Sequence, residues 1–395
     1  MFNRQTYELG SKRSCIRELF EYGLKQAAVV GAENVFDYSL GNPSIPAPPE
    51  VNQSIIDILN TESSLAVHGY TTAAGLPQTR AAIAEDLNER YGLSLRPENF
   101  FMTGGAAQAL IAVLRALNLD AQSEILTPAP HFAEYKPFIE GTGNKYVCVP
   151  EDTANFQINL SALEKLISSH TQAVLINSPN NPSGAIYTRE NLQGLAEILK
   201  QKAAEYGHPI YIISDEPYRE LVYTGEQVPF IPAIYPDTIV CYSWSKSLSL
   251  PGERIGYFLV PDQVTDATAL YAAIAGAARV LGHVCASSLM QRVIGRCAKV
   301  RPDVVQYQEN RQLLYEALTE MGFTCVPPEG AFYLMVKAPD GDGQAFSDAA
   351  KAYNLLIVPT DDFGLPGYVR LSYCVSADMI KRSLPAFKKL RQQYQ

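Results

Sequence analysis

Short apolar runs alternate with helical patterns from about residue 99 to about residue 260, and this alternation limits the fold more than any other feature of the chain. In chain order the runs are NFFMT, SEILT, KYVCV, AVLINS, IYIIS, IVCYS and IGYFLV. Several are separated by stretches that predict helices, such as residues 105–118 and 188–206. Strands joined through helices form a largely parallel sheet that is covered by helices. We therefore expect an α/β fold.

The pattern changes beyond about residue 285. A long helix is expected around 304–321, two strands follow it, and a helix after Ser376 closes the chain, which is typical of a smaller α+β domain. We expect residues 1–45 to form an N-terminal arm and part of this small domain, residues 46–285 the large domain, and residues 286–395 the rest of the small domain.

Composition excludes several classes of function. The net charge of -9 over 395 residues disfavours nucleic-acid and anionic-membrane partners, although a local cationic pocket remains possible. Seven scattered cysteines without a CxxC pair indicate reduced thiols rather than disulfides or a metal site. The first residues, MFNRQTYELGSKRSC, lack the apolar core of a signal peptide. We expect a cytoplasmic protein.

The segment TGGAAQAL follows the run NFFMT and opens a predicted helix. The backbone N–H groups of Gly105, Ala106 and Ala107 would then point at one anion, assisted by the helix dipole. A plain glycine turn fits the same residues, since the segment is neither a Walker loop nor a GxGxxG fingerprint.

Two further polar segments follow strands. NSPNNPSG places Asn181 in a tight loop, where its amide would donate to a ligand or form an Asx turn. SDEPY places Asp215 at the end of the run IYIIS, with Tyr218 just beyond. A carboxylate is costly to bury there unless it pairs with a cation.

Lys246 lies among small hydroxyl residues in the segment SWSKSLSLPGERIGY, which also contains Arg254. A solvated surface loop has the same composition. However, the glycine turn, Asn181, Asp215 and Lys246 all follow strands of one predicted sheet, so we expect them to converge on one site.

In order and spacing, the segments SLGNPSIPAP, HGYTTAAGLPQTR, NPSG, SDEPY, SKSLSLPGERIGY and PEGAFY resemble the motifs of the class I aminotransferases, pyridoxal phosphate (PLP) enzymes of fold type I. The resemblance runs from about residue 39 to residue 373. It implies a mostly parallel seven-stranded sheet in the large domain and a smaller α+β domain. It also implies ping-pong transfer of an amino group between an α-amino acid and a 2-oxo acid.

The resemblance assigns a role to each polar group. Lys246 would hold PLP as an aldimine and then move protons, and Asp215 would pair with the pyridine nitrogen. Asn181 and Tyr218 would hydrogen-bond the phenolic oxygen of the ring. The groups that would bind the phosphate are the amides of Gly105, Ala106 and Ala107, the side chains of Ser243, Ser245 and Arg254, and Tyr70 of the neighbouring subunit. Ser247 is left without a role and is expected to be structural.

Other residues would face the ring and the substrate. Phe132 stands where the family usually has a Tyr or Trp stacked on the cofactor, and it can stack but cannot donate a hydrogen bond. Arg370 would grip the substrate α-carboxylate, a bidentate task that suits a guanidinium. Gly41 would allow the backbone to approach the substrate closely. The role of Tyr70 implies a homodimer with shared active sites.

Alternatives remain at this point. A PLP-dependent β-elimination enzyme of the C–S lyase type shares this cofactor site, while a PLP-binding regulator would need a DNA-binding domain for which the chain has no room. The substrate side chain is open, with an acidic one slightly favoured. Arg279, His283 and Lys12 are the positional candidates for the cation that an acidic side chain would need.

Overall fold

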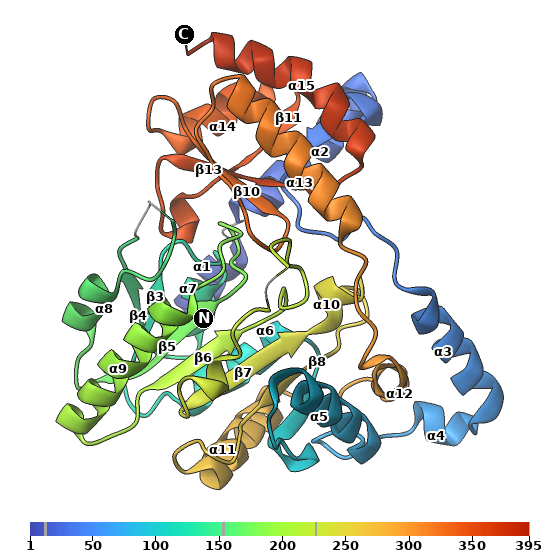
Figure 1. Cartoon of the computed structure of the whole chain (residues 1–395), viewed down its shortest axis with the longest axis vertical. Helices are drawn as coiled ribbons and strands as arrows, with labels where there is room; N and C mark the ends of the chain where they lie inside the picture. Colours follow the sequence, from blue (N-terminus) through green and yellow to red (C-terminus); the bar gives the residue numbers. More distant parts are fainter. Residues whose placement is uncertain (12–13, 152–154, 226, 395) are drawn as a thin grey trace.

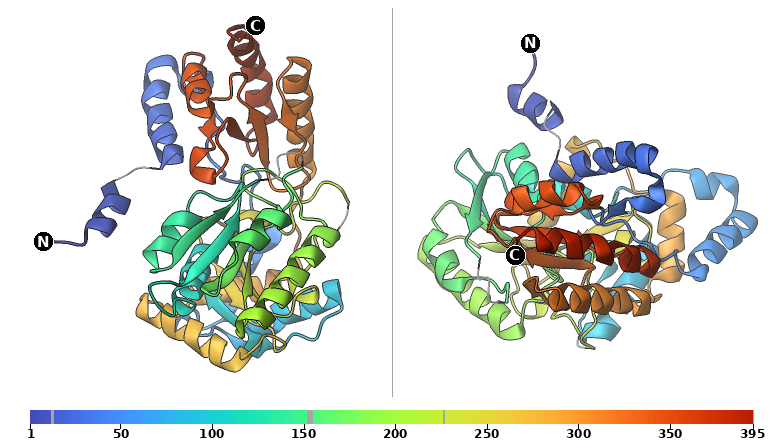
Figure 2. Two further views of the ribbon diagram at one scale, coloured as in Figure 1. Left: turned by 90° about the vertical axis from the view of Figure 1, so that its left-hand side faces the viewer. Right: turned by 90° about the horizontal axis from the view of Figure 1, so that it is seen from above.

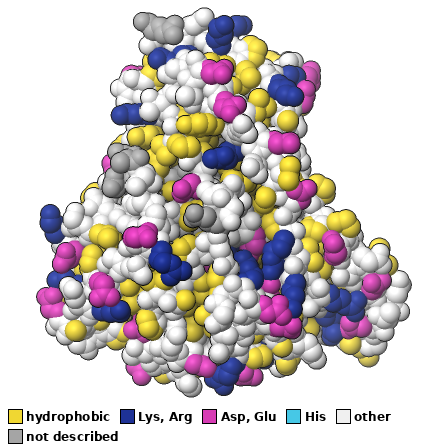
Figure 3. Space-filling view, viewed as in Figure 1, with side chains coloured by type: hydrophobic (Ala, Val, Ile, Leu, Met, Phe, Trp, Pro, Cys, Tyr) yellow, Lys and Arg dark blue, Asp and Glu magenta, His cyan; other side chains and the backbone are white. Residues whose placement is uncertain are grey.

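The computed structural model describes residues 1–11, 14–151, 155–225 and 227–394. A large unit fills the lower part of Figure 1, and a smaller unit that carries the C-terminus lies above it. On the face shown in Figure 3, basic and acidic side chains are interspersed, without a broad patch of one sign. Among the described residues, no helix combines the length and the apolar character needed to cross a membrane.

A seven-stranded sheet forms the centre of the large unit, in the order β2-β8-β7-β6-β5-β3-β4. Its strands are β2 (Phe100–Thr103), β3 (Glu124–Pro128), β4 (Lys145–Val149), β5 (Thr171–Asn177), β6 (Tyr211–Asp215), β7 (Thr238–Ser243) and β8 (Gly256–Leu259). All pairings are parallel except those of β8, which runs antiparallel to β2 and β7. The expected α/β class and mostly parallel sheet are confirmed, and each apolar run forms a strand.

Both faces of this sheet are covered, which is why its strands are apolar throughout instead of alternating with polar residues. Phe101, Ile213 and Phe258 pack on one face. The helices on that face are α6 (Ala106–Ala116), α7 (Tyr135–Gly141) and α11 (Ala267–Val280). The helices on the other face are α3 (Pro49–Thr61), α4 (Ser64–His68), α5 (Pro77–Tyr91), α8 (Leu160–Leu166), α9 (Arg189–Tyr206) and α12 (Ser288–Cys297).

Residues at its two ends determine where α9 begins and ends. The Thr188 side chain accepts a hydrogen bond from the Asn191 amide at the N-terminus, and this satisfies one of the free donors of the first turn. Gly207 ends the helix with φ +75°, a left-handed conformation that glycine adopts without steric cost.

The smaller unit contains a four-stranded antiparallel sheet in the order β12-β13-β10-β9. Its strands are β9 (Cys325–Val326), β10 (Tyr333–Lys337), β12 (Val358–Pro359) and β13 (Tyr368–Ser372). Three helices pack around one apolar core with this sheet: α13 (Val305–Glu320), α14 (Gly343–Lys351) and α15 (Ala377–Gln392).

The beginning of the chain joins this C-terminal unit. Strand β1 (Phe36–Asp37) pairs in parallel with β11 (Leu355–Leu356), and α2 (Cys15–Val30) contacts β11 and β12. Helix α1 (Arg4–Ser11) stands apart from the body in both views of Figure 2.

The domain boundaries at residues 45/46 and 285/286 stay predictions. Helix α12 lies beyond the second boundary in sequence, yet it packs against α3 and α5 of the large unit.

Candidate functional site

A cavity of about 400 Å³ opens at the carboxyl ends of β5, β6 and β7 and extends to the smaller unit. The carboxyl ends of parallel strands lie at one edge of a sheet, where α/β folds bind ligands. Of the residues expected at a site, the cavity wall includes Gly41, Ala106, Ala107, Phe132, Asn181, Asp215, Tyr218, Ser243, Ser245, Lys246, Arg254 and Arg370. The structure therefore brings together residues from both units.

Lys246 lies in the short helix α10 (Trp244–Ser247), which begins directly after β7. Ser243 starts this helix, and its side chain accepts a hydrogen bond from the Ser245 amide. The Lys246 Nζ donates to the Gly41 carbonyl at 2.5 Å. Burial, assisted by the positive charges of Arg370 and Arg254, lowers the pKa of Lys246 to about 8. An amine with this pKa is available as a nucleophile and as a base near neutral pH.

Asp215 is the last residue of β6, and its two carboxylate oxygens differ in their hydrogen bonding. Tyr135 donates its hydroxyl to Oδ2 at 2.6 Å. The buried Oδ1 has no hydrogen-bond partner among the residues that the structure describes. Burial raises the pKa of Asp215 to about 7, and the Tyr135 hydrogen bond opposes that rise. A cationic donor at Oδ1 would satisfy this oxygen and keep the carboxylate ionised.

The N-terminus of α6 lies close to the Arg254 guanidinium. Gly105 precedes α6 with φ +98°, and a Cβ at this position would lie 2.8 Å from Arg254 Nη2. Gly256 permits a second close approach, because a Cβ there would lie 2.8 Å from the Gly105 Cα. Arg254 itself adopts a left-handed φ of +51°. Free helix amides and a nearby guanidinium form an anion-binding arrangement.

Arg370 lies in β13 and is only 1% exposed. Its Nη1 donates to Asn181 Oδ1 at 3.1 Å and its Nη2 to the Ser39 carbonyl at 2.5 Å. Its buried Nε has no hydrogen-bond partner among the described residues. The guanidinium also stacks over the Tyr333 ring at 4.6 Å. This cation is held in one orientation inside the cavity, which suits bidentate binding of a carboxylate.

The approach of the backbone at Gly41 depends on the missing side chain. A Cβ at Gly41 would overlap the Tyr333 hydroxyl, which itself lies 2.9 Å from the Tyr218 hydroxyl. Gly41 and the two tyrosines therefore pack into one wall beside Lys246 and Arg370.

Tyr70 does not line the cavity. Its side chain is 87% exposed, just after α4 and near the equally exposed Leu65.

Two of the three candidate cations for an acidic side chain also lie elsewhere. Arg279 is exposed in the last turn of α11, and His283 is buried beside the Ala73 carbonyl at 3.3 Å. Neither contributes to the cavity wall. Lys12 lies outside the described residues.

Among the residues that sequence reasoning missed are Tyr135, which contacts Asp215, and Tyr333 and Glu134, which line the cavity. The motif PEGAFY contains Phe332 and Tyr333, so its tyrosine was a usable signal for the second. No local pattern could pair Tyr135 with Asp215, because their contact depends on how α7 packs on the sheet.

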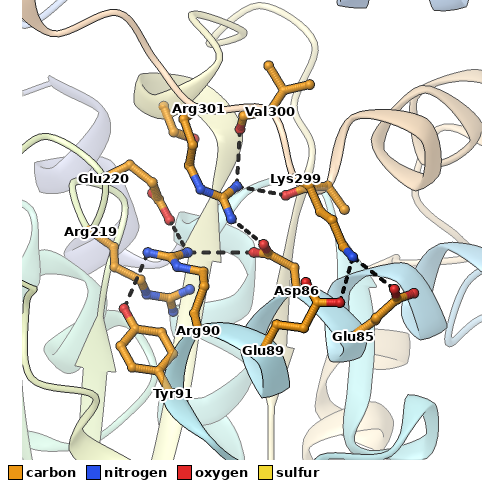
Figure 4. A network of polar contacts seen from close by, with 12 residues as sticks. Glu85, Asp86, Glu89, Arg90, Tyr91, Arg219, Glu220, Lys299, Val300 and Arg301 are labelled. Carbon is orange, nitrogen blue, oxygen red and sulfur yellow. Dashed lines mark hydrogen bonds and ion pairs between the residues drawn. The ribbon is translucent and has the colours of Figure 1, made fainter.

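A second polar network adjoins the site at Ser247. The Ser247 and Tyr242 hydroxyls lie 2.9 Å apart, and Tyr242 donates to Glu220 at 2.8 Å. Figure 4 shows the ion pairs that extend this network: Glu220 pairs with Arg90, and Asp86 pairs with both Arg90 and Arg301. Ser247 therefore anchors α10 from the side away from the cavity, consistent with the structural role expected for it.

Comparison with known proteins identifies relatives along nearly the whole chain. The family "Aminotransferase class I and II" matches residues 33–387. Over 366 residues the chain is 31% identical to an aspartate aminotransferase of Thermotoga maritima, covering 91% of this chain and 92% of that protein. Over 392 residues it is 28% identical to aromatic-amino-acid aminotransferase 2 of Thermococcus litoralis, covering 95% of each.

Solved structures are similar as well. An amino transferase of Eubacterium rectale has 54% sequence identity and a TM-score of 0.98, with 100% of this chain and 99% of that chain covered. A single mutant of Thermus thermophilus aspartate aminotransferase has 26% identity and a TM-score of 0.87, with 99% of each chain covered.

Proposed function

The chain belongs to the class I and II aminotransferases, enzymes that depend on PLP, and on this basis we propose how its own residues bind the cofactor and transfer the amino group. The protein is a transaminase: an amino acid gives up its amino group and leaves as a 2-oxo acid, and a second 2-oxo acid then takes the amino group. The relatives described above are aminotransferases, so the β-elimination alternative is not favoured.

The residues present fit PLP at three points. The free Oδ1 of Asp215 suits the protonated ring nitrogen. The amides of Gly105, Ala106 and Ala107, with Ser243, Ser245 and Arg254, suit the phosphate. Lys246 suits the aldehyde, since its lowered pKa favours the neutral amine. When bound, PLP accepts the amino group and withdraws electrons from the substrate Cα.

Two further contacts are proposed for the cofactor ring. Phe132 would cover one face of it, since its side chain lines the cavity. Asn181 and Tyr218 would hydrogen-bond the phenolic oxygen. The proximity of the Tyr218 and Tyr333 hydroxyls, and the hydrogen bond from Arg370 to Asn181, hold both groups in place.

The chain's own groups then carry out the transfer. Arg370 binds the substrate α-carboxylate and thereby fixes which bonds at Cα face Lys246. The Nζ of Lys246, which donates to the Gly41 carbonyl at 2.5 Å, would take the proton from the substrate Cα and deliver it to the cofactor carbon. Asp215, ionised, would pair with the ring nitrogen and so support the electron withdrawal that the cofactor supplies.

One observation carries this proposal: Lys246, with its pKa of about 8, shares a cavity with a half-satisfied Asp215 and a fixed Arg370. Borohydride treatment of the purified, yellow holoenzyme should fix the cofactor on Lys246, as peptide mapping would show. Lys246→Ala should lose transamination in a panel of amino donors with 2-oxoglutarate as acceptor. Label on another lysine, or normal turnover in this variant, would contradict the proposal.

A homodimer with shared sites is the second part of the proposal. The support is Tyr70, which is too exposed to act in its own cavity and is free to reach the phosphate in a partner's. If Tyr70 and Lys246 act across the interface, mixing the two inactive variants should restore activity, because some hybrid dimers regain one intact site. A fully active monomer in sedimentation would refute this part.

The cellular setting remains a prediction. All seven cysteines are free thiols, which suits a reducing compartment such as the cytoplasm, and a transaminase there would serve amino-acid metabolism.

A further inference from the structure

Some charged residues of the cavity have an assigned function and one does not. The cations Lys246, Arg254 and Arg370 each have a function above. Within the part of the chain that the structure describes, the wall contains one carboxylate besides Asp215, that of Glu134, which precedes α7. No function assigned so far uses Glu134.

The residue before Glu134 packs near the ring on which Arg370 lies. Ala133 packs in one apolar cluster with Ile16 and Phe363. The Arg370 guanidinium lies over the Phe363 ring at 5.2 Å. Glu134 and Arg370 line the same cavity, so a substrate held at Arg370 by its α-carboxylate shares that cavity with the Glu134 carboxylate.

The carboxyl group of Glu134 is unpaired within the described part of the chain. Its side chain is half-buried and has no hydrogen-bond or ion-pair partner among the described residues. Burial, and the negative charge of Asp362, raise the pKa of this carboxyl. A partly desolvated carboxylate beside a second one is stabilised by any cation or strong donor that enters.

The neighbouring wall is apolar. Ile16, Phe132 and Phe138 line the cavity together with Glu134. Such a surface accommodates an aliphatic stem, and the carboxylate can then receive its polar end.

We propose that Glu134 selects the side chain of the amino donor, and that this side chain is an aliphatic stem ending in a cationic hydrogen-bond donor, as in ornithine or lysine. The proposal rests on the transaminase function and names the substrate class of the same site. It differs from the acidic side chain that the sequence slightly favoured, because Glu134 would repel a second carboxylate. Of the candidate cations for an acidic side chain, Arg279 and His283 do not line the cavity, and Lys12 lies outside the described residues.

Binding of compounds without an α-amino group tests the proposal apart from turnover. The pyridoxamine phosphate form of the holoenzyme cannot condense with amines, so it can be titrated calorimetrically with δ-aminovalerate, valerate and glutarate. These three share one carboxylate for Arg370 and differ at the far end of the chain. We expect δ-aminovalerate to bind at least about fivefold more tightly than the other two, as for a partly buried ion pair.

Two variants assign the preference to its residue. Glu134→Gln should reduce the ratio of the δ-aminovalerate and valerate affinities to about one, because a neutral amide keeps the shape and loses the charge. Glu164→Gln makes the same change on the exposed surface of α8 and should keep the wild-type ratio. Asp362→Asn should lower the ratio less than Glu134→Gln.

The outcomes separate this inference from the function on which it rests. If no amino donor supports transfer, the proposed function fails. If transfer occurs but glutarate binds as tightly as δ-aminovalerate, or Glu134→Gln keeps the wild-type preference, only the assignment of substrate class is wrong.

Discussion

Two groups of buried charges meet at α10, and they differ in how fully the charges are paired. In the network around Arg219, each guanidinium has a carboxylate partner: Arg219 donates to Glu216 at 2.5 Å and Arg90 to Glu220 at 2.9 Å. Figure 4 shows how Arg90 and Arg301 share Asp86. In the cavity, by contrast, neither Asp215 nor Arg370 has an oppositely charged partner among the described residues. Unbonded atoms do not make this difference, since Arg219 Nη2 lacks a hydrogen-bond partner as Asp215 Oδ1 and Arg370 Nε do.

The difference shows how similar side chains serve structure in one place and ligand binding in another. A buried ion pair whose charges neutralise each other needs no ligand, and the loss of one partner destabilises the fold. A buried charge without an opposite charge destabilises the ligand-free protein. Binding of a ligand that supplies the opposite charge stabilises the protein again. Adjacent residues illustrate the division, since Ser247 bonds to the network while Lys246 points into the cavity.

The largest effect expected from this contrast is on stability in the network. Glu216→Gln leaves the buried Arg219 without its partner and should lower the free energy of unfolding by about 3–5 kcal/mol. Urea denaturation measures this change. The double variant Glu216→Gln/Arg219→Met should be closer to wild type, because it removes both charges. If Glu216→Gln alone is as stable as wild type, the ion pair is not needed for the fold and the contrast with the cavity is wrong.

Asp215→Asn should reduce turnover without reducing stability, unlike Glu216→Gln. We expect turnover to fall by about 10²–10³-fold, or about 3–4 kcal/mol in the barrier, because the ring nitrogen loses the anion that keeps it protonated. Stability of the cofactor-free protein should be unchanged or higher, since a strained carboxylate is removed. Steady-state kinetics and denaturation together check the prediction, and near-normal turnover would remove Asp215 from the cofactor site.

Lys246→Met should stabilise the cofactor-free protein by about 2–3 kcal/mol at pH 7. The folded-state pKa of about 8 lies below the ordinary value of 10.5, so the protonated amine is disfavoured by folding. In wild type this cost is present at low pH and disappears as pH rises from about 8 to 10.5, so stability should rise over that window. The variant should lack the rise, and parallel curves for both proteins would contradict the assignment.

The smallest expected effect is that of Tyr135→Phe, about 1–2 kcal/mol in cofactor binding. The Tyr135 hydrogen bond lowers the pKa of Asp215, so its loss should raise that pKa above the wild-type value of about 7. The carboxylate is present above its pKa and lost as pH falls through it. PLP affinity should therefore weaken at a higher pH in the variant, as fluorescence titration would show, whereas an unshifted pH profile would argue against the role.

The sequence predicted the large sheet well because each strand is a continuous apolar run bounded by turns, and such runs depend little on distant contacts. The residues that follow those strands, such as Asp215 and Lys246, were predicted at the site for the same reason. Tyr135 and Glu134 were not, because α7 had to be packed on the sheet before their positions relative to Asp215 or Arg370 existed. The packing of α12 on the large unit likewise depends on tertiary contacts.

The pairing of β1 with β11 has a consequence for how the enzyme is made. Synthesis proceeds from the N-terminus, so Phe36 leaves the ribosome long before Leu355, its partner in the strand pair. The strands β2 to β8 can assemble in the meantime, since all of them lie between residues 100 and 259. Arg370 emerges last among the site residues, and the nascent chain can therefore bind a substrate carboxylate there only after the whole large sheet has been synthesised.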